Sequence, residues 1–199
     1  QIFNRAFTDG SGVTNDTYVT QYGDAAPTCS TSHPRADGGT AQSNASATGI
    51  PLTESNLETA KIALSNQLQD DGVPLVDLGE LWIVTTITND KTARIITESN
   101  LRSGTGNNDV NIYSGGAVKV LTSKWLGTAN GGTNNTQWFL VSPTLLKFAV
   151  IISKGPDLEF LIDKDTKSKL WDVILDLGVV SYDWRGIYGS LGDNVAYSG

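Results

Sequence analysis

The chain has 199 residues, a hydrophobic fraction of 39% and 21 glycines, which predicts a loop- and strand-rich globular protein with one domain or two interleaved subdomains. Its formal net charge of −7 argues against tight binding of nucleic acid, although it allows a protein that merely encloses it. The single cysteine excludes an internal disulfide, and no apolar run is long enough for a membrane-spanning helix.

The first 49 residues predict little regular structure. Residues 1–10 are typical of the end of a helix or strand that runs into a turn. Residues 11–49 are polar, lack periodicity and contain two prolines, which is typical of a functional loop or of one supported by neighbouring structure. The sequence has no methionine and begins at Gln1, so we expect a segment to precede it.

A first helix is predicted where apolar residues recur at helical spacing. These residues are Leu57, Ala60, Leu64 and Leu68. Ser55 and Glu58 have the spacing of a capping box at its start, and Gly72 is placed to end it in the left-handed conformation.

A second helix is predicted over residues 89–99. Thr88 is in the position of its N-cap, and Ala93, Ile96 and Leu101 are expected to face inward.

Strands are predicted at residues 81–84, 117–126 and 137–141, with polar loops at 100–116 and 127–136. Residues 145–178 contain three further candidate strands, separated at 154–156 and 163–165. The last candidate alternates over residues 170–177, which favours a strand over an amphipathic helix at 166–177. The resulting fold class is α+β, with helices early and strands late.

The segment 182–190, with the sequence YDWRGIYGS, predicts a C-terminal strand. Side chains alternate along a strand, so Trp184 and Tyr188 are expected on one face and Arg185 and Ile187 on the other.

Residues that carry catalytic or metal chemistry are scarce. His33 is the only histidine, and Cys29 lies four residues before it. Such a pair could supply two metal ligands, but a closed zinc site needs about four. The sequence also lacks a nucleophile elbow and a phosphate-binding glycine loop. We therefore expect Cys29 and His33 to be neither catalytic nor metal-bound, and the protein to be no enzyme and to need no cofactor.

Short motifs are distributed over residues 3–190. They are Asn4-Arg5-Ala6-Phe7, His33-Pro34, Ser43-Asn44, Leu57-Glu58-x-Ala60, Asp71-Gly72-x-Pro74-Leu75, Leu81-Trp82-Ile83-Val84, Asn107-Asn108-Asp109-Val110-Asn111, Trp138-Phe139-Leu140 and Asp183-Trp184-Arg185. In this order they resemble the major capsid proteins of tailed bacteriophages with the Hong Kong 97-type fold.

The resemblance implies two interleaved domains. Residues 1–49 and 147–178 would form a peripheral domain, and residues 50–146 would form an axial domain to which 179–199 returns with the last strand. Compared with the family, we expect the chain to lack the N-terminal arm, the extended loop and most of the spine helix.

The implied function is that of a structural subunit of an icosahedral capsid. Such subunits assemble with themselves into homo-pentamers and homo-hexamers around double-stranded DNA, in the host cytoplasm, without sequence-specific DNA binding or a membrane. Portal, scaffold and decoration proteins are further candidate partners.

The resemblance also places residues 100–113 at the centre of each capsomer. The residues expected to contact neighbouring subunits are Arg102, Asn107, Asn108, Asp109 and Asn111. The alternative is an ordinary mobile surface loop.

Two other functions are compatible with the sequence. One is an encapsulin-like shell that holds enzyme cargo. The other is a secreted β-rich adhesin or carbohydrate-binding module, which the acidic composition rich in Thr, Asn and Gly suggests.

Overall fold

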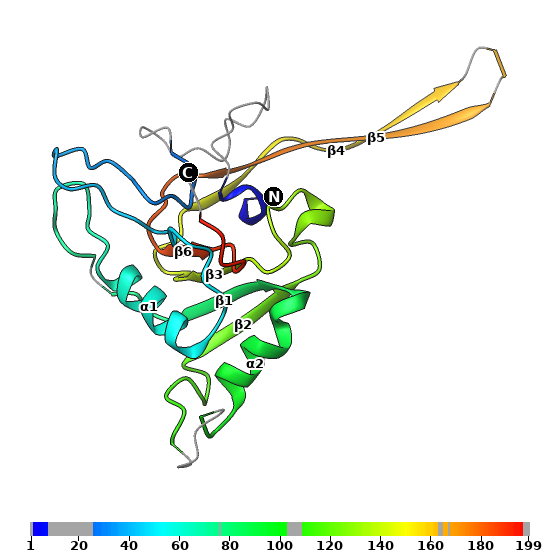
Figure 1. Ribbon diagram of the computed structural model, residues 1–199. Helices are drawn as coiled ribbons and strands as arrows, with labels where there is room; N and C mark the ends of the chain where they lie inside the picture. Colours follow the sequence, from blue (N-terminus) through cyan, green and yellow to red (C-terminus); the bar gives the residue numbers. More distant parts are fainter. Residues whose placement is uncertain are drawn as a thin grey trace.

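The computed structural model describes residues 2–7, 26–75, 77–102, 109–162, 165–166 and 168–196. Within this part of the chain, a body built on a four-stranded sheet carries a long projecting β-hairpin (Figure 1). The strands of the sheet are, in spatial order, β2 (Val118–Ser123), β1 (Leu81–Thr86), β3 (Trp138–Val141) and β6 (Ile187–Ser190). The predicted α+β class is confirmed.

Strands β1 and β2 are parallel, whereas the pairs β1–β3 and β3–β6 are antiparallel. A parallel pair needs a crossover connection, and α2 (Asp90–Glu98) provides it. The predicted strands at 81–84 and 137–141 are confirmed, and the one at 117–126 is shorter than expected.

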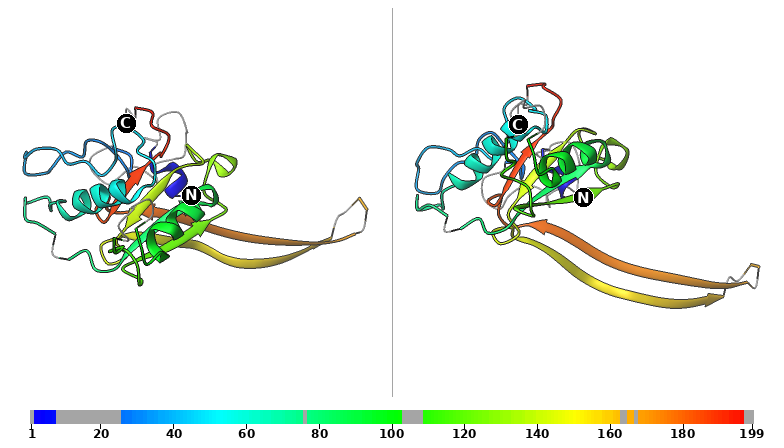
Figure 2. Two further views of the ribbon diagram at one scale, coloured as in Figure 1. Left: turned by 60° about the horizontal axis from the view of Figure 1, so that its bottom comes forward. Right: turned by 90° about the horizontal axis from the view of Figure 1, so that it is seen from below.

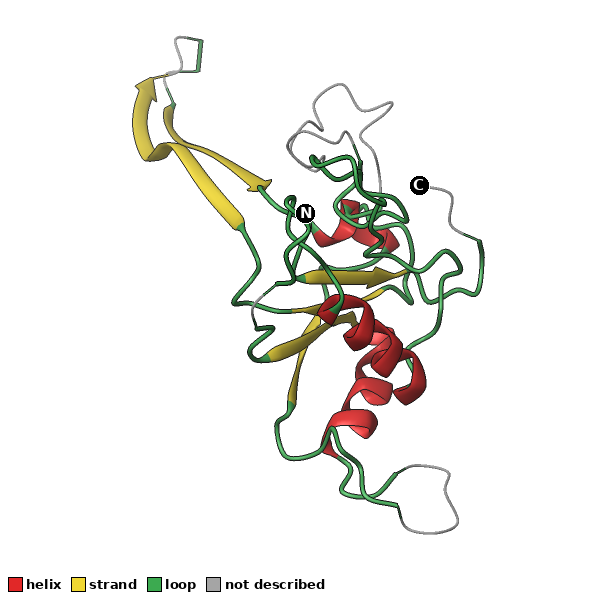
Figure 3. Cartoon of the chain, turned by 90° about the vertical axis from the view of Figure 1, so that its left-hand side faces the viewer, coloured by secondary structure: helices red, strands yellow, loops and turns green. Residues whose placement is uncertain are grey.

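The sheet separates two hydrophobic cores. On one side, α1 (Glu54–Ser65) and α2 pack against it through buried residues such as Leu57, Leu64 and Ala93. On the other side, the 3-10 helix η1 (Phe3–Arg5) and the segment 26–49 cover it. Figure 3 shows the two α-helices on one side of the sheet and the N-terminal segment on the other.

The first helix begins and ends differently from the sequence prediction. Its N-cap is Thr53, whose hydroxyl accepts a hydrogen bond of 3.2 Å from the Asn56 N–H, so the expected capping box at Ser55 is wrong. The helix ends at Ser65 and therefore excludes Leu68. Gly72 does adopt a left-handed conformation, with φ +82°, but in the turn that follows the helix.

The second helix also begins later than predicted. Thr88 lies within a 3-10 turn, η2 (Ile87–Asn89), and does not cap α2. Ala93 and Ile96 are buried as expected. Leu101 is 47% exposed, so its inward placement is wrong: the helix ends at Glu98, and the helical phase does not extend to residue 101.

The hairpin consists of β4 (Phe148–Ile162) and β5 (Lys169–Ser181), and it extends well beyond the body in Figure 2. The strand at 170–177 is confirmed and the alternative helix is wrong. The predicted break at 154–156 is also wrong. β4 continues through these residues because register shifts between Ile152 and Asp157 accommodate the extra residues as bulges.

The C-terminal strand is shorter than predicted. Residues 182–186 form a loop in which Gly186 has φ +81°, a conformation that favours glycine. Trp184 therefore does not alternate with Tyr188 along one strand. Tyr188 and Ile187 do lie on opposite sides of the sheet, one in each core.

The helices of the described segments are too short and too polar to cross a membrane. The division into peripheral and axial domains stays a prediction, as does the fold type that the resemblance implies.

Candidate assembly surfaces

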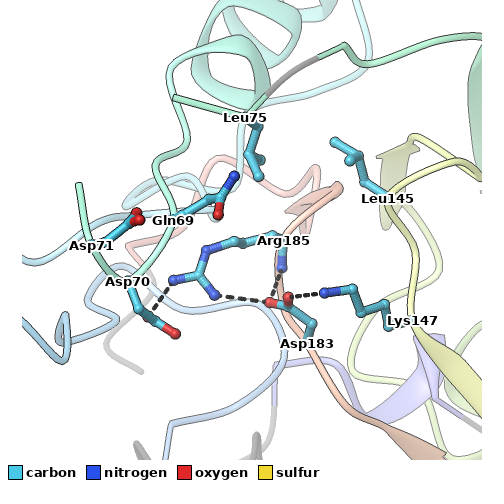
Figure 4. Close-up of a pocket in the computed structure, with 8 residues that line it drawn as sticks. All are labelled: Gln69, Asp70, Asp71, Leu75, Leu145, Lys147, Asp183 and Arg185. Atoms are coloured by element: carbon cyan, nitrogen blue, oxygen red, sulfur yellow. Dashed lines mark hydrogen bonds and ion pairs between the residues drawn. The ribbon is translucent and has the colours of Figure 1, made fainter. Parts of the chain in front are cut away.

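The hairpin leaves the body at a cluster of charged residues (Figure 4). The Tyr182 N–H donates to the Lys147 carbonyl at 2.9 Å, and Lys147 Nζ lies 3.2 Å from Asp183 Oδ2. These contacts join the chain entering β4 to the chain leaving β5. A cavity of about 490 Å³ opens beside them, lined also by residues 69–71.

Arg185 is the centre of this cluster. Its Nη1 donates to Asp183 Oδ1 at 3.1 Å, its Nη2 to Asp70 Oδ1 at 2.6 Å, and its Nε to the Leu68 carbonyl at 2.7 Å. The Arg185 and Asp183 side chains are nearly buried, whereas Asp70 is largely exposed. The pair with Asp183 therefore contributes more to stability, because solvent screens exposed ion pairs.

The pKa of Asp183 lies below its ordinary value. Burial alone would raise this pKa, but the backbone N–H and guanidinium of Arg185 and the ammonium of Lys147 favour the charged form more strongly. The carboxylate is therefore ionised at neutral pH. It holds the base of the hairpin to the loop that leads into β6.

Trp184 connects this cluster to the segment 26–49. Its ring stacks on His33, with centroids 4.2 Å apart and planes inclined by 4°, and the guanidinium carbon of Arg185 lies 4.7 Å from the Trp184 centroid. The Asn44 amide nitrogen donates to the Thr28 and Trp184 carbonyls, so Asn44 Oδ1 is the acceptor for His33 Nε2 at 3.0 Å. This assigns the proton of His33 to Nε2.

Cys29 and His33 lie in different environments. Cys29 is fully buried in the core that contains Phe7 and Phe139, and burial raises the pKa of its thiol. His33 belongs to the polar network described above. Within the described ranges, no group of three or more His, Cys, Asp and Glu side chains is arranged to hold a metal ion. The expectation that neither residue is catalytic or metal-bound stays a prediction.

The hairpin has two chemically different faces. Residues directly opposite each other in an antiparallel pair share a face, and Phe160 pairs with Trp171 as Leu158 pairs with Val173. We define the apolar face by Val150, Ile152, Leu158, Phe160, Trp171, Val173, Leu175 and Leu177. These side chains are each between 46% and 65% exposed.

The opposite face is mixed, since it carries carboxylates together with four exposed apolar side chains, those of Ile151, Leu161, Leu170 and Ile174. On it, Glu159 lies across from Asp172, and Lys154 lies across from Asp176. Asp157 is on the same face and forms an ion pair with Lys154 at 2.9 Å. We call this the acidic face. The acidic face thus carries four carboxylates and one lysine.

The described ends of the loop predicted to contact neighbouring subunits, residues 100–102 and 109–113, lie at the opposite end of the body from the hairpin (Figures 1 and 3). A backbone hydrogen bond of 2.8 Å from Arg102 to Asp109 closes its base, and Arg102 Nε donates to Glu54 at 2.9 Å. The structure thus brings Arg102 and Asp109 together. Asn107 and Asn108 lie outside the described residues.

Asn111 differs from the other candidate contact residues because it is buried. Its amide nitrogen donates to the Ile96 and Ser99 carbonyls at 2.5 and 2.8 Å, and its Oδ1 accepts from the Tyr113 N–H at 2.9 Å. Its side chain thereby fastens the loop to the end of α2. In this conformation the amide is engaged within its own chain instead of being presented to a neighbour.

Sequence reasoning missed the exposed apolar residues at this loop. Leu101, Val110 and Ile112 are all exposed, and a backbone bridge joins Leu101 to Val110. The alternation of Val110 and Ile112 around Asn111 was the available signal, since an inward Asn111 directs its neighbours outward. The long hairpin had a signal too: the alternation over residues 170–177 predicts a strand, and a strand needs a partner for its backbone hydrogen bonds.

Comparison with known proteins identifies no family for the chain. No protein-family model matches it, and no curated protein matches it. Among solved structures it is similar to a virus-like particle from Pyrococcus furiosus, with 12% identity and a TM-score of 0.35. The match covers 71% of this chain and 56% of that one, so this chain spans little more than half of its length.

Proposed function

We propose that the protein is a structural subunit of a closed shell, formed by many copies of the same chain. The observation that carries this proposal is the projecting hairpin with its exposed apolar face. A two-stranded ribbon alone is at best marginally stable in water, and a contiguous apolar surface of this size is typical of an interaction site. Contacts with other subunits would supply the missing burial.

The specific form that we propose is a major capsid protein of the tailed-phage type, assembling into pentamers and hexamers around double-stranded DNA. The ordered series of motifs supports this form, as does the long hairpin that projects from the body, which suits lateral contacts in a shell. The net charge of −7 suits a wall that encloses DNA without binding it tightly. The proposal includes no catalytic role.

Electron microscopy of the purified protein tests the shell proposal. We expect closed particles of uniform diameter, and for a viral capsid made in the presence of genomic DNA we expect nuclease-resistant DNA inside them. The proposal is contradicted if the protein stays in small oligomers at all protein and salt concentrations, even when scaffold or portal proteins are added.

A shell that encloses protein cargo is the second candidate. The same exposed ribbon favours it, because any closed shell needs extended contacts between subunits. The contents of the particles decide between the two: nuclease-resistant DNA supports the capsid, and a co-purifying enzyme supports the cargo shell. Glycan binding by protein that forms no particles would favour an adhesin instead.

A further inference from the structure

We propose that the apolar face of the hairpin is a two-fold contact between two copies of this chain. The two ribbons pack face to face and run in opposite directions, so that the tip of each lies over the base of the other. This inference rests on the proposed function as a shell subunit and names the surface by which two subunits join.

The charges of the acidic face indicate which face of the ribbon a second copy can cover. Glu159 and Asp172 lie directly across the two strands, an arrangement of like charges that is unfavourable unless water screens it. Covering this face with the same face of a second copy would add further carboxylates to it. The four carboxylates make this face the less favourable one to cover, so the two copies meet through their apolar faces.

The exposed area of the apolar face is as large as the area that one partner buries in a stable dimer. Its eight side chains are large and about half exposed, with on the order of 100 Å² each still accessible. Together they present roughly 800 Å² per copy, which is about what each partner buries in a stable protein interface. The ribbon alone can thus supply the contact.

The distribution of side-chain sizes favours ribbons that run in opposite directions. Near the tip, Phe160 and Trp171 form an aromatic pair with ring centroids 5.0 Å apart. Near the base, Val150 pairs with Val179, and both are smaller than the aromatic residues at the tip. Opposite directions place large side chains of one copy over small ones of the other, which keeps a uniform spacing of about 10 Å between the two layers.

The two-fold axis is expected at the centre of the ribbon. Leu175 is the middle residue of β5, and Gly155 is the middle residue of β4. Lys154 pairs with Asp176 and Asp157 with Ile174, so Leu175 lies across from the bulge that contains Gly155. Gly155 has no side chain, and a Cβ atom built on it would meet nothing within 4 Å. With the axis at this point, Leu175 meets Leu175 of the second copy, and the bulge of each β4 faces the bulge of the other without side-chain bulk between them.

Sedimentation equilibrium of the 199-residue chain tests the contact through two adjacent residues on opposite faces. Leu175→Asp introduces a charge on the apolar face, and Ile174→Asp introduces the same charge on the acidic face. We expect the native chain to dimerise and Leu175→Asp to raise the dimer dissociation constant by about 100-fold or more. Ile174→Asp should change this constant by less than about threefold.

Disulfide crosslinking tests the position of the axis. Cys29 is the only cysteine and is fully buried, so a cysteine introduced on the ribbon is the reactive one. At a two-fold axis a residue meets its own copy. Mild oxidation should therefore convert Leu175→Cys, but not Ile174→Cys, to a covalent dimer.

The inference is wrong if the native chain stays monomeric at about 100 µM, or if both aspartate substitutions raise the dimer dissociation constant equally. It is also wrong if both cysteine variants crosslink equally, or if the Leu175→Asp variant forms particles as readily as the native chain. The last outcome overturns the contact and leaves the shell proposal standing. Dimers that respond to Leu175→Asp as expected but never form particles would instead retain the contact and contradict the shell.

Discussion

Gly189 shows how closely the segments of the body are packed at the level of a single residue. Its N–H donates to the Asn44 carbonyl at 2.9 Å, so residues 44–46 run along the outer edge of β6. A Cβ atom at Gly189 would lie 2.7 Å from Cys29 Sγ, 2.9 Å from Phe7 Cζ and 3.1 Å from Phe139 Cδ1. The backbone can come this close to the core only without a side chain.

We predict that Gly189→Ala destabilises the protein by roughly 1–3 kcal/mol, because the methyl group would overlap with the core side chains beside it. Chemical denaturation measures the change in the free energy of unfolding. Gly178→Ala is the matched control, since Gly178 also lies in a strand but its Cβ would meet nothing within 4 Å. Equal costs for both substitutions would contradict this account.

Asp183 predicts an acid dependence of stability. Its pKa is lower in the folded protein than in the unfolded chain, where it is about 3.9. The carboxylate therefore contributes stability above the unfolded pKa, and this contribution is lost as the pH falls through the folded pKa. We predict that Asp183→Asn lowers stability at neutral pH and removes part of the stability loss seen below about pH 4.

Denaturant unfolding of both proteins from neutral to acidic pH measures this dependence. Asp70→Asn is the control, because Asp70 is largely exposed and its ion pair with Arg185 contributes little. If Asp70→Asn changed the acid dependence as much as Asp183→Asn, the role assigned to Asp183 would be wrong.

At the level of elements, α1 owes its stability to one buried stripe. Leu64 is fully buried in the core between α1 and the sheet. We predict that Leu64→Ala costs roughly 2–5 kcal/mol, from lost burial and the cavity that remains. Thermal or chemical denaturation provides the measurement, with the exposed Ile62→Ala on the same helix as a nearly neutral control.

The start of α1 offers a separate test of its boundary. Thr53→Ala removes the side chain that accepts the Asn56 N–H, so we expect it to cost about 1 kcal/mol. Ser55→Ala should cost less, because Ser55 lies within the first turn and does not cap the helix. The reverse order of the two costs in denaturation experiments would restore the capping box that the sequence suggested.

For the whole molecule, the main prediction concerns where the loop at 100–113 and the hairpin lie in an assembled particle. In an assembled particle we expect residues 100–113 to lie nearest the five- or six-fold axis and the hairpin to lie away from it. A reconstruction of the particle by electron cryo-microscopy provides the measurement. Finding the loop at the periphery of the capsomer, with the hairpin at the axis, would refute this assignment of Arg102 and Asp109 to the central contact.

Periodicity in the sequence indicated the type and buried face of the main local elements, but not their bounds. The spacing of Leu57, Ala60 and Leu64 predicted the buried stripe of α1, and alternation over residues 170–177 predicted β5. Both signals depend only on which side chains fall on the same face of an element. The α+β class followed from them.

The tertiary structure alone decided the features that depend on distant partners. Arg185 and Asp70, which form an ion pair, are 115 residues apart, and no local pattern indicates which acid Arg185 meets. β4 continues through Pro156 because β5 pairs with it on both sides of a bulge. Asn111 is buried because the end of α2 presents carbonyl groups to it. Strand pairing and the burial of polar groups depend on residues far away in the chain, so they are settled only when the whole chain folds.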